Sequence, residues 1–131
     1  MSMIDAYEDN PNAKIDVLEA ILKASEGLSE DDFDGGKWAS PHYASHRTWC
    51  VVGWAVDRGA IPGIKVNAVG NLVPATENRN PTGWPLLCRE LGVSLSVCMF
   101  MFYGRESVQG VRDAIRSFID DWKEDKLAAS S

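Results

Sequence analysis

The sequence predicts a mainly α-helical fold: a compact bundle of about five helices, with a small β-hairpin inserted between the second and third. An α+β fold is the alternative. Apolar residues recur at helical spacing in two long stretches, one near each end of the chain. One short central stretch instead alternates apolar and polar residues, as strands do. The chain has 131 residues, of which 45% are hydrophobic, so we expect one domain over residues 1–131 with its own core.

The first helix is predicted over residues 11–26. Pro11 suits its start, because proline is tolerated in the first turn of a helix. Gly27 ends it, and residues 1–10 before it form an acidic lead-in that we expect to be flexible. The apolar face of this helix consists of Ile15, Val17, Leu18, Ile21 and Leu22.

A second helix is predicted over residues 41–58, after an acidic, turn-rich loop at residues 29–37. Ser40 is placed to cap it and Gly59 to follow its end, although Thr48 could cap a shorter version. A β-hairpin then follows over residues 64–73. In it Ile64, Val66 and Ala68 alternate with polar residues, and Gly70-Asn71 makes a tight turn into Leu72 and Val73.

Two short helices are predicted over residues 85–91 and 95–103, with the spacing of a helix-turn-helix. Gly92 stops the first and Ser94 caps the second, while the small Cys88 allows the two helices to approach closely. The inward residues are Leu87, Leu91, Val93, Cys98 and Met101. The outward residues of the second helix are Leu95, Ser96, Met99, Phe100 and Tyr103. Arg, Lys, Asn and Gln, which match the donors and acceptors of the major groove, are absent from these positions.

The last helix gives the clearest pattern. Ser107 is its predicted cap, and we expect residues 124–131 to fray into a flexible tail. One face of this helix is apolar and the opposite face is charged, which is typical of a helix that packs against a core on one side only. The apolar stripe consists of Val108, Val111, Ile115, Phe118 and Trp122.

Charge and cysteine content narrow the function. The net charge of −6 argues against a nucleic-acid partner and against an anionic membrane surface. Three scattered cysteines fit reduced thiols and a cytoplasmic location better than a disulfide framework. Phosphate-binding glycine motifs and a G-x-S-x-G motif are absent from the sequence, and we expect no cofactor.

Three patterns imitate a chemical site. His42 and His46 are four residues apart, so on a helix they would lie side by side and could bind a metal ion as weak candidate ligands. Cys50, one turn after His46, could form a Cys-His nucleophile pair, although its neighbours are core residues. The acidic loop begins like a calcium loop, but Pro41 stands where the last ligand should be.

The order of landmarks resembles a family of small uncharacterised domains found in actinobacteria and their phages. The shared features are an N-terminal helix at residues 17–25, a glycine-containing acidic linker, the motif Cys50-Val51-Val52-Gly53-Trp54-Ala55 and a final amphipathic helix. The resemblance covers about half of the chain and brings no catalytic residues with it. It implies a small, phage-type accessory protein that acts by binding. Residues 87–108 also resemble the bihelical unit of bacterial repressors, with apolar residues at the reading positions.

The leading hypothesis is a non-enzymatic binding or regulatory protein that contacts a protein partner or a second copy of itself. Met99, Phe100 and Tyr103 are the candidate contact residues, because an apolar helix must be buried on several sides or docked to a partner. One alternative is a helix-turn-helix DNA-binding regulator. Its basic patch would need Lys65, Arg79, Arg89 and Arg105. The other is a small Cys/His enzyme or metal protein.

Overall fold

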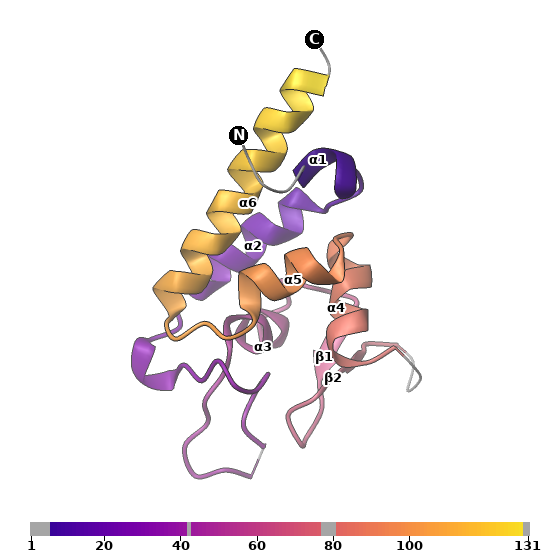
Figure 1. The fold of residues 1–131 in the computed structure, drawn as a ribbon. Coiled ribbons are helices and arrows are strands. Elements are labelled where there is room, and N and C mark those ends of the chain that lie inside the picture. Colours follow the sequence, from indigo (N-terminus) through magenta and orange to yellow (C-terminus); the bar gives the residue numbers. More distant parts are fainter. Residues whose placement is uncertain (1–5, 42, 77–80, 130–131) are drawn as a thin grey trace.

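The computed structural model describes residues 6–41, 43–76 and 81–129, and these form a mainly helical fold with one small antiparallel hairpin, as predicted. The hairpin separates three helices from the next three (Figure 1). The helices are α1 (Ala6–Asp9), α2 (Ile15–Ser25), α3 (Val51–Asp57), α4 (Gly83–Leu91), α5 (Leu95–Phe102) and α6 (Val108–Ala129), and the strands are β1 (Ile64–Val66) and β2 (Leu72–Pro74).

Helix α6 is the longest element and lies beside α2, with α5 crossing below them (Figure 1). All five residues of its predicted apolar stripe are buried. Ser107 caps it as predicted, since its Oγ accepts a hydrogen bond from the N–H of Gly110 at 2.9 Å. The acidic loop adds a second cap, because the carboxylate of Glu30 accepts hydrogen bonds from the N–H groups of Val108 (2.9 Å) and Gln109 (3.2 Å).

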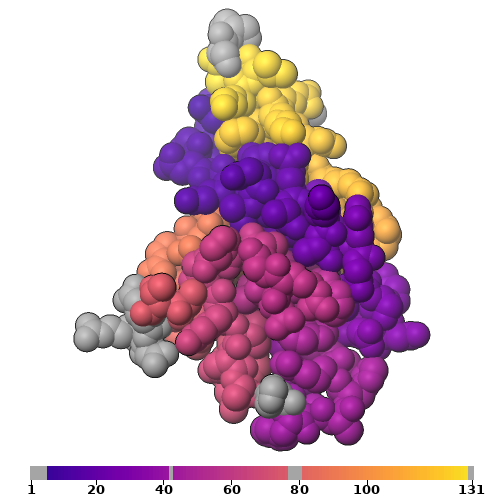
Figure 2. Space-filling model, turned by 180° about the vertical axis from the view of Figure 1, so that it is seen from behind, coloured from indigo at the N-terminus to yellow at the C-terminus, as the bar shows by residue number. Residues whose placement is uncertain are grey.

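Both ends of the described chain are helical, although the sequence predicts flexible ends. Helix α6 continues to Ala129 instead of fraying at residue 124, and residues 6–9 form α1 against it. The N–H of Ala6 donates to the carboxylate of Asp125 at 2.9 Å, and the Tyr7 and Trp122 rings meet edge-on. Figure 2 shows these two segments forming the narrow end of the molecule. Contacts distant in sequence therefore stabilise both segments.

Helix α2 begins at Ile15 and not at residue 11. The preceding segment is used in tertiary contacts, because Asn10 joins three parts of the molecule. Its side-chain oxygen accepts from the N–H of Ser94 (2.7 Å) and its amide donates to the carbonyl of Ala6 (3.2 Å). Its backbone carbonyl accepts from the indole N–H of Trp122 at 2.9 Å. These bonds favour a turn over a first helical turn at this position.

The prediction of a helix over residues 41–58 was wrong in its first half. Helix α3 begins only at Val51, and the cap is Cys50 instead of Ser40 or Thr48: its Sγ accepts from the N–H of Gly53 at 3.4 Å. The preceding backbone is paired with residues 32–40. The N–H groups of Trp49 and Cys50 donate to the carbonyls of Asp32 (2.9 Å) and Trp38 (3.2 Å), respectively. Hydrogen bonds between these two segments thus satisfy backbone N–H groups that a longer helix would have paired within itself.

The hairpin pairs Ile64 with Pro74, Lys65 with Val73 and Val66 with Leu72. Its turn is longer than predicted, since Ala68 and Gly70-Asn71 lie in a loop over residues 67–71. The side-chain oxygen of Asn67 accepts from the N–H groups of Val69 (3.2 Å) and Asn71 (2.9 Å), and holds this loop closed. Ile64 and Leu72 point to the core.

Helices α4 and α5 meet at 102°, within the range of a helix-turn-helix. Gly92 ends α4 in the left-handed conformation (φ +69°), and the Oγ of Ser94 caps α5 by accepting from the N–H of Val97. A Cβ on Gly92 would lie 2.3 Å from the carbonyl oxygen of Asn12, so this glycine admits the N-terminal segment rather than the other helix of the pair. All five predicted inward residues are buried.

Candidate functional site

Helix α5 has one buried and one exposed face, and the exposed face is apolar except for Ser96. Val97, Cys98, Met101 and Phe102 are buried in the core. On the other side Leu95 is 51% exposed, Phe100 46% and Tyr103, which follows the helix, 63%, while Met99 is half-buried. We call Leu95, Met99, Phe100 and Tyr103 the outer face of α5. The three predicted contact residues, Met99, Phe100 and Tyr103, therefore lie together on this face.

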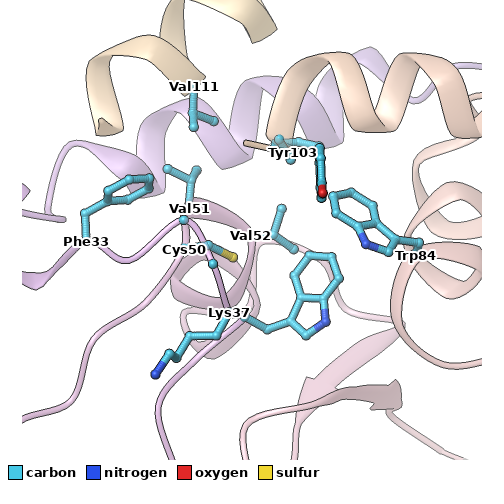
Figure 3. A pocket seen from close by; sticks show the side chains of 12 residues that line it. Phe33, Lys37, Cys50, Val51, Val52, Trp84, Tyr103 and Val111 are labelled. Atoms are coloured by element: carbon cyan, nitrogen blue, oxygen red, sulfur yellow. The ribbon is translucent and has the colours of Figure 1, made fainter. Parts of the chain in front are cut away.

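The outer face ends at a cavity of about 160 Å³ (Figure 3). Its wall is formed by the loop after the 3-10 turn Glu30–Asp32, the beginning of α3, the beginning of α4, the end of α5 and one residue of α6. Tyr103 belongs both to the outer face and to the cavity. The lining residues are Phe33, Gly35, Gly36, Lys37, Trp38, Cys50, Val51, Val52, Trp84, Phe102, Tyr103 and Val111.

Three aromatic side chains stand side by side at this cavity. The rings of Trp38 and Trp84 are 4.7 Å apart between centroids, with an angle of 62° between their planes. Trp84 and Tyr103 are 6.2 Å apart at 65°. Both contacts have the edge-to-face geometry that aromatic quadrupoles favour. We call Trp38, Trp84 and Tyr103 the aromatic wall.

Gly53 allows Trp38 to reach this position. A Cβ at Gly53 would lie 1.8 Å from the carbonyl oxygen of Trp38, so only glycine lets that backbone lie directly on α3. The same carbonyl accepts a hydrogen bond from the N–H of Cys50 at 3.2 Å. The motif Cys50-Val51-Val52-Gly53-Trp54-Ala55 also contacts α2. The indole N–H of Trp54 donates to the carbonyl of Ala24 on α2 at 2.8 Å. The motif therefore joins α3 to the Trp38 segment and to α2.

The thiol of Cys50 lies at the cavity as a neutral group. Burial raises its pKa to about 11, so it is protonated at neutral pH. His46 does not lie one helical turn away, because residues 43–50 are not helical. The geometry on which the Cys-His nucleophile hypothesis rested is therefore absent. Burial likewise raises the pKa of Cys98, with the neighbouring Cys88 as a further cause.

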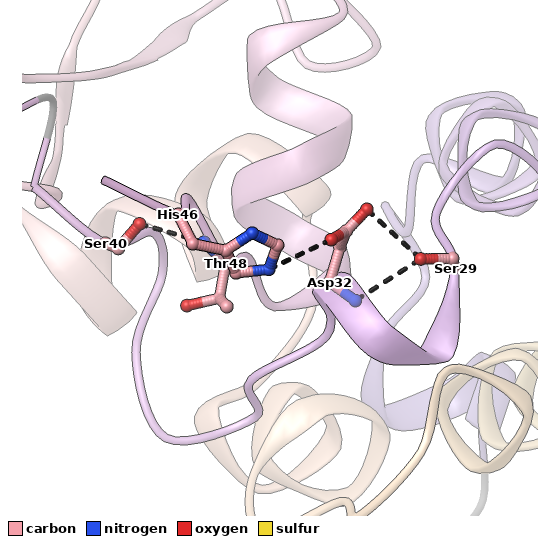
Figure 4. A network of polar contacts seen from close by, with 5 residues as sticks. All are labelled: Ser29, Asp32, Ser40, His46 and Thr48. Atoms are coloured by element: carbon pink, nitrogen blue, oxygen red, sulfur yellow. Dashed lines mark hydrogen bonds and ion pairs between the residues drawn. The ribbon is translucent and has the colours of Figure 1, made fainter. Parts of the chain in front are cut away.

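His46 takes part in a polar network on the surface (Figure 4). Its Nε2 lies 3.2 Å from the carboxylate of Asp32, which also accepts from the hydroxyl of Ser29 at 3.1 Å. His42, the other weak metal candidate, lies outside the described residues. Among the residues that the structure describes, no group of three His, Cys, Asp or Glu side chains could hold a metal ion. The described part of the segment between the two histidines, residues 43–46, is not helical.

The residues of the hypothetical DNA-binding patch are distributed over different elements. Arg89 pairs with Glu90 at 3.1 Å, and the guanidinium of Arg105 donates to the carbonyl of Phe100 at 3.2 Å. Lys65 lies on β1, and Arg79 lies outside the described residues. The N-terminus of α5, which would approach the bases in a repressor, is held by Asn10. The helix-turn-helix geometry is thus present without a basic reading surface on α5.

Sequence reasoning found the outer face but missed the aromatic wall. Trp38 and Trp84 lie far apart in the sequence, and neither belongs to a periodic apolar pattern. A signal was present nonetheless, since each tryptophan directly follows a segment that contains glycine, at residues 35–37 and 82–83. Exposed loops built this way often carry binding residues.

Comparisons with known protein families, with curated proteins and with solved structures found no match for this chain. The resemblance to small domains of actinobacteria and their phages therefore stays a prediction. Within the described ranges, no single helix is long and apolar enough to cross a membrane. Helices α4 and α5 reach that length and composition only as a pair bent by 102°.

Proposed function

We propose that this protein is a non-enzymatic binding module that acts through protein–protein contacts, with the outer face of α5 as the contact surface. The observation that carries the proposal is the sidedness of α5. Its core face is buried, yet Leu95, Phe100 and Tyr103 stay 46% to 63% exposed on the opposite face. Single exposed apolar residues are common, whereas several on one helix face are typical of an interaction surface.

The neighbouring chemistry supports binding more than catalysis. The Cys50 thiol is buried and neutral, and the imidazole of His46 is paired with Asp32 on the surface. Met99 adds a flexible, polarizable side chain, a type common at adaptable binding surfaces. We also propose a cytoplasmic location, since all three cysteines are free thiols and such thiols persist in a reducing compartment.

The test compares two charge insertions at exposed apolar positions. Phe100→Glu places a carboxylate on the outer face, and Val69→Glu makes a similar change at the hairpin turn, where Val69 is 58% exposed. The immobilised wild-type protein and the Val69→Glu variant should retain the same proteins from a lysate of the native host. Phe100→Glu should weaken their capture at least tenfold while keeping the wild-type circular dichroism spectrum.

Sedimentation velocity on the same variants separates a foreign partner from a second copy. If the partner is a second copy, the wild type and Val69→Glu should dimerise with rising concentration and Phe100→Glu should stay monomeric. The proposal is overturned if Phe100→Glu matches the wild type in both measurements.

A further inference from the structure

The cavity beside α5 has the size of one aromatic ring. Its volume is about 160 Å³. An apolar cavity of about 150 Å³ is known to stay dry and to bind benzene. The cavity therefore fits a phenyl-sized group.

The lining favours a neutral ring over a cation. Among the described residues that line the cavity, Lys37 alone carries a charge. Aromatic cages for quaternary ammonium groups depend on electron-rich ring faces, and the positive charge of Lys37 in the lining of this cavity opposes a second positive charge. Val51, Val52 and the Cys50 thiol also line the cavity, and they suit an apolar ring (Figure 3).

Lys37 also favours an acidic neighbour for that ring. Its Nζ lies 3.6 Å from the carboxylate of Asp34, and both side chains are well exposed, at 50% and 38%. Such a surface pair contributes little, so exchanging Asp34 for a carboxylate of the ligand costs little. Asp34 keeps another partner when Lys37 leaves, since its Oδ1 accepts from the N–H of Gly36 at 2.9 Å.

The position of the cavity indicates a polypeptide rather than a free small molecule. A free ring of this size has few atoms through which to gain affinity. Tyr103 lines the cavity and also ends the outer face of α5. A chain lying on that face could therefore place one side chain in the cavity and gain affinity from both contacts. Interfaces commonly depend on one buried aromatic residue surrounded by weaker contacts.

We propose that this cavity receives one phenylalanine side chain of a protein partner, stacked against the aromatic wall, with an acidic residue of the partner beside Lys37. The inference rests on the proposed function, because it names the anchor that the partner would use. The experiment uses no partner protein, so the result for this inference is independent of the result for the proposed function.

The experiment is a titration of the purified, ¹⁵N-labelled protein with blocked dipeptides, followed through the indole N–H signals of its tryptophans. The probes are acetyl-Asp-Phe-amide, acetyl-Lys-Phe-amide, acetyl-Asp-Ala-amide and tetramethylammonium. Measurement at about 0.15 M ionic strength limits repulsion by the net charge, because the Debye length is then about 8 Å. Trp54 and Trp122 serve as internal references, since their indole N–H groups donate to backbone carbonyls elsewhere.

The Asp-Phe probe should shift the signals of Trp38 and Trp84 saturably and leave those of Trp54 and Trp122 unchanged. The Lys-Phe probe should bind several-fold more weakly, and Lys37→Glu should reverse that order. Trp84→Ala should weaken binding of the Asp-Phe probe at least tenfold, whereas Val69→Glu, at a position that does not line the cavity, should bind it as the wild type does. The proposal is overturned if the Phe probes leave Trp38 and Trp84 unshifted, if Asp-Ala binds equally well, or if tetramethylammonium binds there instead.

Discussion

Substituting Gly53 by alanine tests how the candidate site is assembled. The substitution adds one methyl group to α3, at a point where the new Cβ would lie 1.8 Å from the carbonyl oxygen of Trp38. Because the obstructing atom belongs to the backbone, a change of rotamer cannot relieve the clash. The segment that carries Trp38 must move away from α3, and the hydrogen bond between the Cys50 N–H and the Trp38 carbonyl is then lost.

The expected cost follows from three contributions. Overpacking in a well-packed interior costs about 1 to 3 kcal/mol, and the upper half applies here because the neighbour is backbone. Loss of the hydrogen bond adds about 1 kcal/mol. The higher helix propensity of alanine stabilises α3 by about 1 kcal/mol and offsets part of this cost. We therefore expect Gly53→Ala to lower the free energy of unfolding by about 2 to 3 kcal/mol, which for a chain of this size corresponds to a Tm lower by about 7 to 11 °C.

Urea unfolding followed by circular dichroism measures this difference, and Gly110→Ala in α6 is the matched control. There the new Cβ meets only the Oγ of Ser107, at 3.2 Å, so the propensity gain should dominate and stability should rise by up to about 1 kcal/mol. If Gly53→Ala were as stable as the wild type, the close approach of Trp38 to α3 would not be a feature of the folded protein.

Two further predictions concern helix caps. Glu30→Ala removes the acceptor for the N–H groups of Val108 and Gln109, and should lower the free energy of unfolding in urea by about 1 kcal/mol, with a smaller loss for Glu30→Gln. Because burial raises the pKa of the Cys50 thiol from 9.0 to about 11, the unfolded chain releases this proton first and stability falls between those pH values. Cys50→Ser keeps a capping side chain and should show a smaller fall over that range; an equal fall would contradict this origin.

Local patterns in the sequence predicted the elements that form most of the core. The spacing from Val108 to Trp122 predicts α6, and Ser107 is its cap as expected. The helix pair α4 and α5 is confirmed as well, including which residues of α5 face outward. Periodicity records which side of a helix meets the core, and a helix needs only its own residues to show it.

Local patterns gave wrong predictions where backbone groups form hydrogen bonds with segments distant in the sequence. Ser40-Pro41 is a good local start for a helix, yet residues 48–50 pair with residues 32–40 and α3 begins only after them. At the two ends of the described chain, Asp125 holds the N–H of Ala6, a contact between residues that no local pattern connects.

The sequence by itself determined the helical class, the position of the hairpin, and an apolar outer face on α5 that is unsuited to reading DNA. These properties depend on residue type and spacing within one element. Only the tertiary structure decided that Trp38 and Trp84 meet beside Tyr103 around a ring-sized cavity. Trp38 can reach Trp84 only if its backbone lies directly on Gly53. This contact joins two separate segments, and neither segment has a periodic sequence pattern that would predict it.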